Sequence, residues 1–283
     1  MGGQARLVIV DIFQRGREVN HSLSEHPAGL GCKVIRHKSG AAETLFTGFT
    51  IPAFKGGGGA RSAITGLSGK SGRRMAFEFA KLGDQLAYME TLTMPPDAVA
   101  DGRVLKKALN VYLQRVRRDG GGYGWFLEFQ RNNSPHFHVF LTKPTSNNSQ
   151  ELSKMWAGIY CQALKSSQDF FSVYDDSILV RMSKASGRTE RLRKEGGAWR
   201  YAMKYACKSE QKEVPSAFEN VGRFWGIGGT LAGTVANTEH LSGADALAMW
   251  ELCQNRTPDN LPYVRRKHFQ GLPDSRTRGR GNQ

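Results

Sequence analysis

Two stretches rich in apolar and aromatic residues, 123–129 and 135–141, have the length and composition of β-strands. The residues between them, Arg131-Asn132-Asn133-Ser134, favour a turn. We therefore expect the two stretches to pair as a hairpin. Side chains alternate between faces along a strand, so His136 and His138 are expected on one face, with Phe137 and Val139 in a core on the other.

Helical spacing of apolar residues marks a second kind of segment. In 101–118, apolar side chains recur every three or four positions, as on the buried stripe of an amphipathic helix. Helices are also predicted at 71–82, 149–164, 199–209 and 243–253. Further strands are predicted at 6–13, 33–51, 85–93 and 170–180, the second of them either continuous or turning back at 38–40. The mixture predicts an α+β fold, with a central antiparallel sheet covered by helices.

Composition changes along the chain and suggests how it is organised. Seven glycines fall within 56–72, which is typical of a flexible linker. The expected segments are a β-rich N-terminal part at 1–55, a linker at 56–72, a main domain at 73–230, a helical segment at 231–262 and a basic, disordered tail at 263–283.

The two histidines gain a chemical role if an oxygen ligand lies beside them. The predicted hairpin brings Glu128 next to the face that carries His136 and His138. Two imidazoles and one carboxylate can bind a divalent cation and leave coordination positions open for substrate oxygens. The alternative is that both histidines are polar residues on the solvated face of a half-buried sheet.

A Tyr- and Lys-rich segment follows in the predicted helix 199–209. Tyr201 and Tyr205 share one helical face, and Lys204 and Lys208 form a neighbouring stripe. A phenol has an unperturbed pKa near ~10, so it needs a nearby cation to act as a nucleophile at neutral pH. The lysines can meet the charge that develops on a phosphate. The alternative is an amphipathic helix whose tyrosines pack and whose lysines are solvated.

Three motifs, in this order and spacing, resemble those of the rolling-circle replication initiators of the HUH endonuclease superfamily, in the form found in single-stranded DNA phages and some bacterial plasmids. The first is an apolar strand that ends in Thr91-Leu92-Thr93. The second combines Glu128 with His136-Phe137-His138, and the third is 201–208 in its two-tyrosine form. The resemblance covers roughly residues 68–228.

This resemblance implies that 73–230 is an HUH nuclease domain with an RRM-like palm and a DNA nicking and strand-transfer activity. Tyr201 or Tyr205 would attack a phosphodiester in single-stranded or melted origin DNA. The tyrosine would become linked to the 5′-phosphate and release a 3′-hydroxyl that primes DNA synthesis. The second tyrosine would cut the regenerated origin, and which of the two acts first stays open.

The same resemblance assigns roles to the other motif residues. The metal would be Mg²⁺ or Mn²⁺, bound by Glu128, His136 and His138 and acting as a Lewis acid on a phosphate oxygen. Lys204 and Lys208 would contact the scissile phosphate.

The formal net charge of +15 favours a polyanionic partner but does not identify it. Its distribution is more informative, because ten basic and four acidic residues lie within 181–215, around the two tyrosines. The tail 264–283 has six basic residues and one acidic residue. Arg200, Lys212 and Arg223 are the expected DNA contacts.

Other features bear on the compartment and on the partners. No apolar run approaches the ~20 residues of a membrane span, and the N-terminus does not resemble a signal peptide. The four cysteines are widely spaced, so we expect free thiols in a bacterial host cytoplasm. The stretch 66–71 is similar to a phosphate-binding loop but has Ile64 where a glycine is required. Strand separation and synthesis are therefore expected from a host helicase and polymerase.

Two alternatives to a replication initiator stay open. An HUH transposase or relaxase would use the same chemistry on a different DNA substrate. A non-enzymatic single-stranded nucleic-acid-binding protein would instead use its tyrosines to stack on bases, with incidental histidines.

Overall fold

The structure is a computed structural model and describes residues 31–47, 63–95, 101–165, 176–193, 197–207, 213–216, 218–254 and 266–268. The chain divides into two compact units. The central unit is Ala60–Thr234, and the terminal unit combines Met1–Gly59 with Val235–Gln283. The predicted strand at 6–13 lies outside the described residues.

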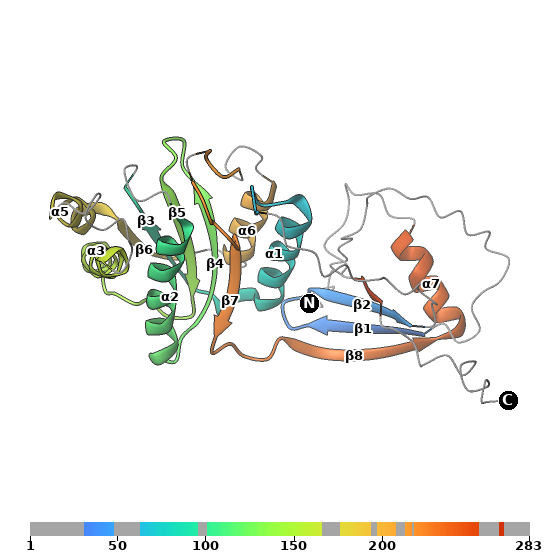
Figure 1. Cartoon of the computed structure of the whole chain (residues 1–283). Coiled ribbons are helices and arrows are strands. Elements are labelled where there is room, and N and C mark those ends of the chain that lie inside the picture. Colours follow the sequence, from blue (N-terminus) through green and yellow to red (C-terminus); the bar gives the residue numbers. More distant parts are fainter. Residues whose placement is uncertain are drawn as a thin grey trace, which may run out of the picture. The chain divides into compact units, whose positions relative to one another are not determined.

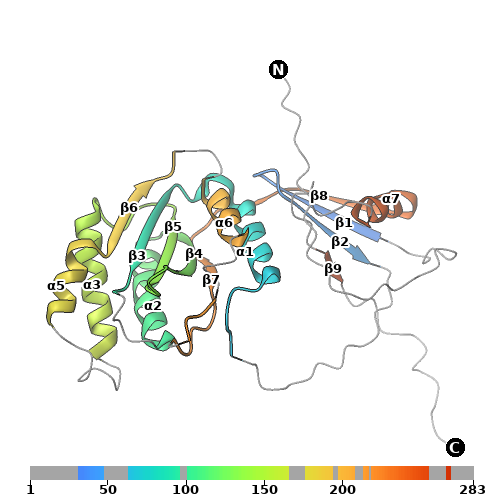
Figure 2. The ribbon, with the colours of Figure 1, turned by 90° about the horizontal axis from the view of Figure 1, so that it is seen from above.

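The central unit contains a five-stranded sheet in the order β6-β3-β5-β4-β7, with every neighbouring pair antiparallel. Its strands are β3 (Tyr88–Thr93), β4 (Gly122–Phe129), β5 (Pro135–Leu141), β6 (Gly187–Arg191) and β7 (Trp225–Gly229). The predicted hairpin is confirmed as β4 and β5, and β5 is the central strand of the sheet (Figure 2).

Helices cover both faces of this sheet (Figure 1). They are α1 (Gly69–Leu82), which continues into the 3₁₀ turn η1 (Gly83–Gln85), α2 (Gly102–Arg118), α3 (Ser149–Lys165), α5 (Asp176–Ala185) and α6 (Gly197–Cys207). Helices α2 and α3 lie against one face and α1 and α6 against the other, while α5 packs on α3. The predicted α+β fold with a helix-covered antiparallel sheet is confirmed at this level.

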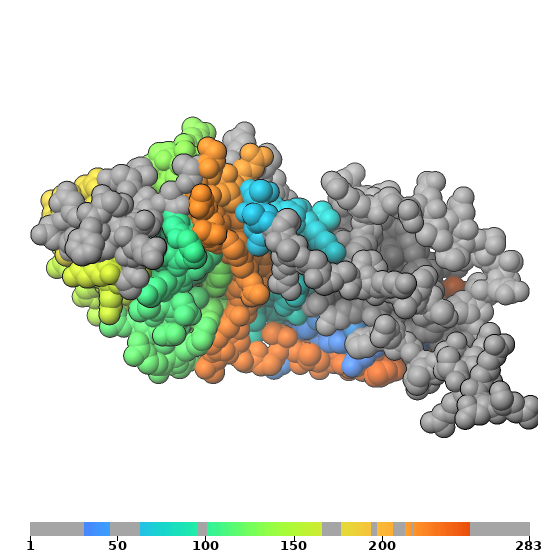
Figure 3. Space-filling model, in the orientation of Figure 1, coloured from blue at the N-terminus to red at the C-terminus, as the bar shows by residue number. Residues whose placement is uncertain are grey.

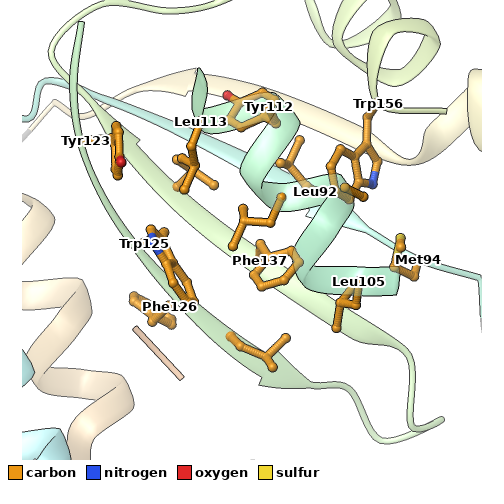
Figure 4. Close-up of a cluster of buried hydrophobic side chains, with 14 of the residues drawn as sticks. Leu92, Met94, Leu105, Tyr112, Leu113, Tyr123, Trp125, Phe126, Phe137 and Trp156 are labelled. Carbon is orange, nitrogen blue, oxygen red and sulfur yellow. The ribbon is translucent and has the colours of Figure 1, made fainter. Parts of the chain in front are cut away.

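The main hydrophobic core lies between the sheet and the pair α2 and α3 (Figure 4). Phe137 of β5 meets Trp125 and Trp156 edge-on, with ring centroids 5.8 and 6.4 Å away. All three rings are at least nine-tenths buried. Strand alternation directs Phe137 and Trp125 away from the histidine face, and Trp156 of α3 packs on them.

A smaller core lies between the sheet and α1. Phe79 of α1 meets Phe140 of β5 edge-on at a centroid distance of 5.4 Å. A Cβ at Gly124 of β4 would lie 2.7 Å from Phe79, so only glycine lets the helix approach the sheet this closely.

Capping side chains fix the starts of two helices. The Ser68 hydroxyl accepts a hydrogen bond from the Ser71 backbone N–H at 3.2 Å, and the Asp101 carboxylate accepts one from Arg103 at 2.9 Å. Because of the Ser68 cap, α1 begins two residues earlier than predicted and takes its first turn from the expected linker at 56–72.

The terminal unit is a four-stranded sheet in the order β8-β1-β2-β9 with one helix. Its elements are β1 (Gly31–His37), β2 (Ala42–Thr47), β8 (Val235–Ser242), α7 (Gly243–Gln254) and β9 (Arg266–His268). The predicted hairpin turning at 38–40 is confirmed as β1 and β2. Segments from both ends of the chain thus share one sheet, since β1 also pairs with β8.

Three expectations about secondary structure are wrong. The predicted strand 170–180 is helical from Asp176 onward, where α5 buries Ile178 and Met182, four residues apart, on one face. The expected helical segment 231–262 contains the strand β8 ahead of the predicted helix 243–253, which is itself confirmed as α7. Within the expected disordered tail, Arg266–His268 pair with β2. Strands β6 and β7 were not predicted at all.

The described residues also bear on the expectations about membrane spans and about the cysteines. In the described part of the chain, no helix has both the length and the apolar character that a bilayer span requires. Cys32 and Cys161 are buried thiols.

Candidate active site

The candidate site lies on the sheet face covered by α6, at the end of the β4–β5 hairpin. In the register of this hairpin, Glu128 is directly opposite His136, and Phe126 is opposite His138. Residues directly opposite in antiparallel strands have their side chains on the same face. The structure therefore brings together the three residues that the sequence proposed as metal ligands.

Glu128 and His138 form a buried ion-pair-type contact. The Nε2 atom of His138 lies 3.0 Å from a Glu128 carboxylate oxygen, and both residues are more than nine-tenths buried. Phe126 packs on the imidazole at a centroid distance of 4.9 Å. The opposite ring nitrogen of His138, Nδ1, is buried without a hydrogen-bond partner within the described structure.

His136 is held by side chains of a neighbouring strand and of the hairpin turn. Its Nδ1 atom lies 2.8 Å from the Thr93 hydroxyl and 3.3 Å from the side-chain amide of Gln130. Burial, and then the proximity of His138, lower the pKa of His136 to about 3. The ring is therefore neutral at physiological pH, and a neutral imidazole can offer one ring-nitrogen lone pair to a cation.

Tyr205 of α6 lies directly over the buried pair. Its ring packs on His138 and Phe126, both at centroid distances of 4.9 Å, and its hydroxyl is hydrogen-bonded to Glu128. Partial burial, then the charge of Glu128 and the proximity of Tyr201, raise the pKa of Tyr205 to about 12. The phenol is thus protonated and donates to the carboxylate.

Tyr201 lies one helical turn away on the same face of α6. Its ring is stacked with that of Tyr205 at a centroid distance of 6.2 Å and 17° between planes, and it packs on Phe140 of β5. Both tyrosines are partly buried on the sheet. The predicted shared helical face of the two tyrosines is confirmed. Of the two, Tyr205 is the one for which the structure resolves a contact with Glu128.

The donor set, two imidazoles and one carboxylate, fits a divalent cation in chemical type. The 3.0 Å separation of His138 and Glu128 is that of a hydrogen bond. The described ranges nevertheless hold no group of three His, Cys, Asp or Glu side chains that could hold a metal ion as they stand.

The basic residues predicted for this region are only partly described. Lys204 is exposed on α6, on the turn between the two tyrosines. Lys208 and Lys212 lie outside the described residues.

Arg200 lines a hollow at the β6 edge of the sheet. The hollow has a volume of about 640 Å³ and is lined by β6, the residues after it and the first turn of α6, including Tyr201. Arg188, Arg191 and Arg193 add positive charge, and Glu190 is the acidic residue in the lining. The predicted DNA contact Arg200 is therefore close to Tyr201, in a basic surface.

Arg223 lines a second hollow, at the β7 edge. This hollow, hereafter the β7-edge hollow, has a volume of about 530 Å³ and lies between the start of α1 and β7. Its lining also contains Lys70, Arg74 and Trp225. Two of the three predicted DNA contacts thus lie in hollows at opposite edges of one sheet.

Several residues of the site were not identified from the sequence. Thr93 had been noted as part of a motif, but its bond to His136 depends on the pairing of β3 with β5. Gln130 and Trp225 were likewise not singled out as site residues. A single residue at the end of a strand carries no signal for such a role until the order of the strands in the sheet is known.

The chain matches no family model, no curated protein and no solved structure.

Proposed function

We propose that the chain is a replication-initiating nickase of the HUH type, which cuts and rejoins single-stranded origin DNA through a 5′-phosphotyrosine intermediate. On this proposal the helix-covered antiparallel sheet is an HUH palm. The observation that carries the proposal is the contact of the Tyr205 hydroxyl with Glu128, which is itself hydrogen-bonded to His138. A nucleophile and a ligand set are thereby adjacent on one sheet face.

The chemistry assigns each atom a destination. The Tyr205 oxygen forms a bond to the phosphorus, and the bond from phosphorus to the 3′-oxygen breaks. The phenol loses one proton and the departing 3′-oxygen gains one, so no proton is consumed overall. One phosphodiester is exchanged for another, so the reverse transfer can rejoin the strand without an external energy source.

Lowering the barrier depends on neutralising charge around Glu128. Mg²⁺ or Mn²⁺ held by Glu128, His136 and His138 would supply Lewis-acid polarisation of the scissile phosphate. The carboxylate that raises the pKa of Tyr205 is the same group that would face the cation, so its charge would no longer oppose phenolate formation. Lys204, exposed beside both tyrosines, contacts the phosphate in this arrangement, and Lys208 is assigned the same role from the sequence.

The geometry also favours an order of action. We propose that Tyr205 makes the first cut, because its hydroxyl is the one bonded to Glu128. Tyr201, one turn away and lining the β6-edge hollow, then serves the second cut. The released 3′-hydroxyl would be extended by a host polymerase behind a host helicase, in the bacterial cytoplasm.

The non-enzymatic alternative receives less support from the tyrosines. A base-stacking platform presents its ring face to solvent, whereas Tyr205 packs on His138 and Phe126. The transposase and relaxase alternatives share the chemistry and differ only in the DNA that is recognised.

A covalent-adduct assay tests the proposal. The protein is incubated with labelled single-stranded DNA and Mn²⁺, with and without EDTA, and analysed on denaturing gels. We expect a metal-dependent adduct that Tyr205→Phe abolishes on the first cut and that Tyr201→Phe retains. Tyr88→Phe, the same change on the opposite sheet face, is the control and should leave the adduct intact. Bound DNA without any adduct on a panel of single strands would overturn the proposal.

A further inference from the structure

The β7-edge hollow concentrates positive charge at the start of a helix. Lys70 and Arg74 belong to the first two turns of α1, Arg223 faces them from the segment before β7, and all three are exposed. Figure 3 shows α1 (cyan) and the β7 segment (orange) side by side on the surface. The one acidic side chain in the lining, Glu78, already pairs with Lys81 at 2.8 Å.

The charge on α1 is the reverse of what a helix start usually has. The first turn holds no acidic residue, and the Ser68 cap leaves further backbone N–H groups directed out of the helix. The helix dipole makes cations unfavourable there and anions favourable. A basic first turn therefore costs stability unless an anion such as a phosphate is bound.

Trp225 supplies an aromatic surface in the same hollow. Its indole Nε1 donates a hydrogen bond to the Ser71 hydroxyl at 2.9 Å, which fixes the orientation of the ring. The Arg74 guanidinium lies 5.9 Å from the ring centroid, and Trp225 is only partly buried. An oriented indole with cations around it is the combination that binds single-stranded nucleic acid, by stacking one base and contacting its phosphates.

Strand pairing places the β7-edge hollow in the same row of side chains as the candidate active site. Trp225 is directly opposite Phe126 of β4, and Phe126 is directly opposite His138 of β5. The three side chains therefore form a row across one sheet face, and two strand spacings, ~10 Å, separate Trp225 from His138. A DNA strand at the tyrosines can reach the hollow with a neighbouring nucleotide.

We propose that the β7-edge hollow binds one nucleotide of single-stranded DNA, with its base stacked on Trp225 and its phosphates contacted by Lys70, Arg74 and Arg223. The binding itself is independent of the nickase proposal; only the statement that this nucleotide belongs to the strand being cut depends on it. The volume of about 530 Å³ is within the range of small-ligand sites.

Binding in EDTA, where no cutting occurs, tests the site. Affinity for a labelled dT10 oligonucleotide is measured by anisotropy over a range of salt concentrations. We expect Arg74→Gln/Arg223→Gln to weaken binding about tenfold and to reduce the salt slope by about 1.4, since each lost phosphate contact on a single strand removes ~0.7. Arg115→Gln/Arg118→Gln, which removes two exposed charges from α2, is the matched control and should change both values little.

Trp225→Ala tests the stacking contact separately. We expect about a tenfold loss of affinity at an unchanged salt slope, and loss of any indole fluorescence quenching that dT10 causes in the wild type. Thermal unfolding of each variant verifies that it folds, and Trp225→Phe, which keeps a ring, should lose less affinity.

Several outcomes would overturn the inference. They are equal losses in the two arginine pairs, wild-type affinity in Trp225→Ala, or binding of the mononucleotide dTMP as tight as that of dT10. The two proposals can also fail separately. If the binding results are as expected but wild type forms no adduct, the nucleotide site stands and the nickase proposal falls.

Discussion

The carboxylate of Glu128 bonds to His138, one diagonal step across the β4–β5 hairpin, rather than to His136, which is directly opposite. This choice leaves the two histidines with different surroundings. His138 is fixed by Glu128 and by Tyr205, whereas His136 is fixed by Thr93 from the next strand. The three proposed ligands are thus contacted from three elements, β3, the hairpin and α6.

Replacing the carboxylate should separate metal binding from folding. Glu128→Gln keeps the shape of the side chain and removes the charge, so we expect Mn²⁺ affinity to fall about 10–100-fold and adduct formation to fall at least as much. Isothermal titration with Mn²⁺ and the adduct assay measure the two effects. Glu219→Gln, an exposed carboxylate of the same unit, serves as the control. Unchanged Mn²⁺ affinity in Glu128→Gln would remove this residue from the ligand set.

The Thr93 hydroxyl should matter through His136. Thr93→Val preserves volume but removes the hydrogen bond to Nδ1, which frees the ring to rotate or to change tautomer. We expect about a tenfold loss of Mn²⁺ affinity with little change in the unfolding midpoint. Thr91→Val makes the same change two residues away on the same face, and should leave Mn²⁺ affinity within twofold of wild type. If both variants lose affinity equally, the effect comes from the strand and not from the hydrogen bond.

The parts of this site that the sequence predicts are those that depend on residues close together in the chain. The β4–β5 hairpin and the facing of Tyr201 and Tyr205 follow from strand alternation and helical spacing, and the structure confirms both. The position of Glu128 beside the histidine face needed only the pairing of the hairpin. These parts could be predicted because each depends on residues close together in the chain.

The missed elements depend on partners far away in the chain. Strand β6, Gly187–Arg191, has a polar sequence without an apolar face and forms by pairing with β3. Strand β7 is rich in glycine because it packs closely, and a Cβ at Gly226 would lie 2.9 Å from the Trp125 ring. The apolar run after Asp176 suggested a strand, but burial of two residues four apart against α3 makes it helical.

A buried network on the opposite sheet face should control stability. Glu90 is fully buried and accepts hydrogen bonds from the Tyr112 hydroxyl and from the backbone N–H and hydroxyl of Thr145. Burial and the charge of Glu90 raise the pKa of Tyr112 well above its usual value, so the hydroxyl stays a donor.

Removing one donor leaves that carboxylate less well satisfied. We expect Tyr112→Phe to lower the free energy of unfolding by about 1–3 kcal/mol, and Glu90→Ala to cost more, in urea titrations. Tyr88→Phe, a partly buried tyrosine on the same strand as Glu90, should cost less than 1 kcal/mol. Mn²⁺ affinity should be retained in folded Tyr112→Phe, because the network and the ligand set lie on opposite faces.

Lys106 should make stability depend on pH. Its ammonium lies 4.4 Å from the Trp125 ring centroid and donates to the Arg223 backbone carbonyl, and burial together with the charge of Arg223 lowers its pKa to about 7. In the unfolded chain its pKa is ~10.4. Between these values the unfolded chain binds more protons than the folded one, so stability rises with pH from about 7 to about 10 and this contribution is flat below 7.

Lys106→Met removes the titrating group and keeps an unbranched side chain over Trp125. We expect the wild type to gain up to about 1 kcal/mol of unfolding free energy per pH unit between pH 7.5 and 9.5 from this group, and the variant to lack that gain. The variant should therefore be more stable than the wild type at pH 6, with the difference shrinking by pH 9.5. Lys107→Met, at an exposed position one residue on, should leave the pH slope unchanged. Urea titrations at pH 6, 7.5 and 9.5 measure the slopes, and parallel curves for wild type and Lys106→Met would contradict a lowered pKa at this site.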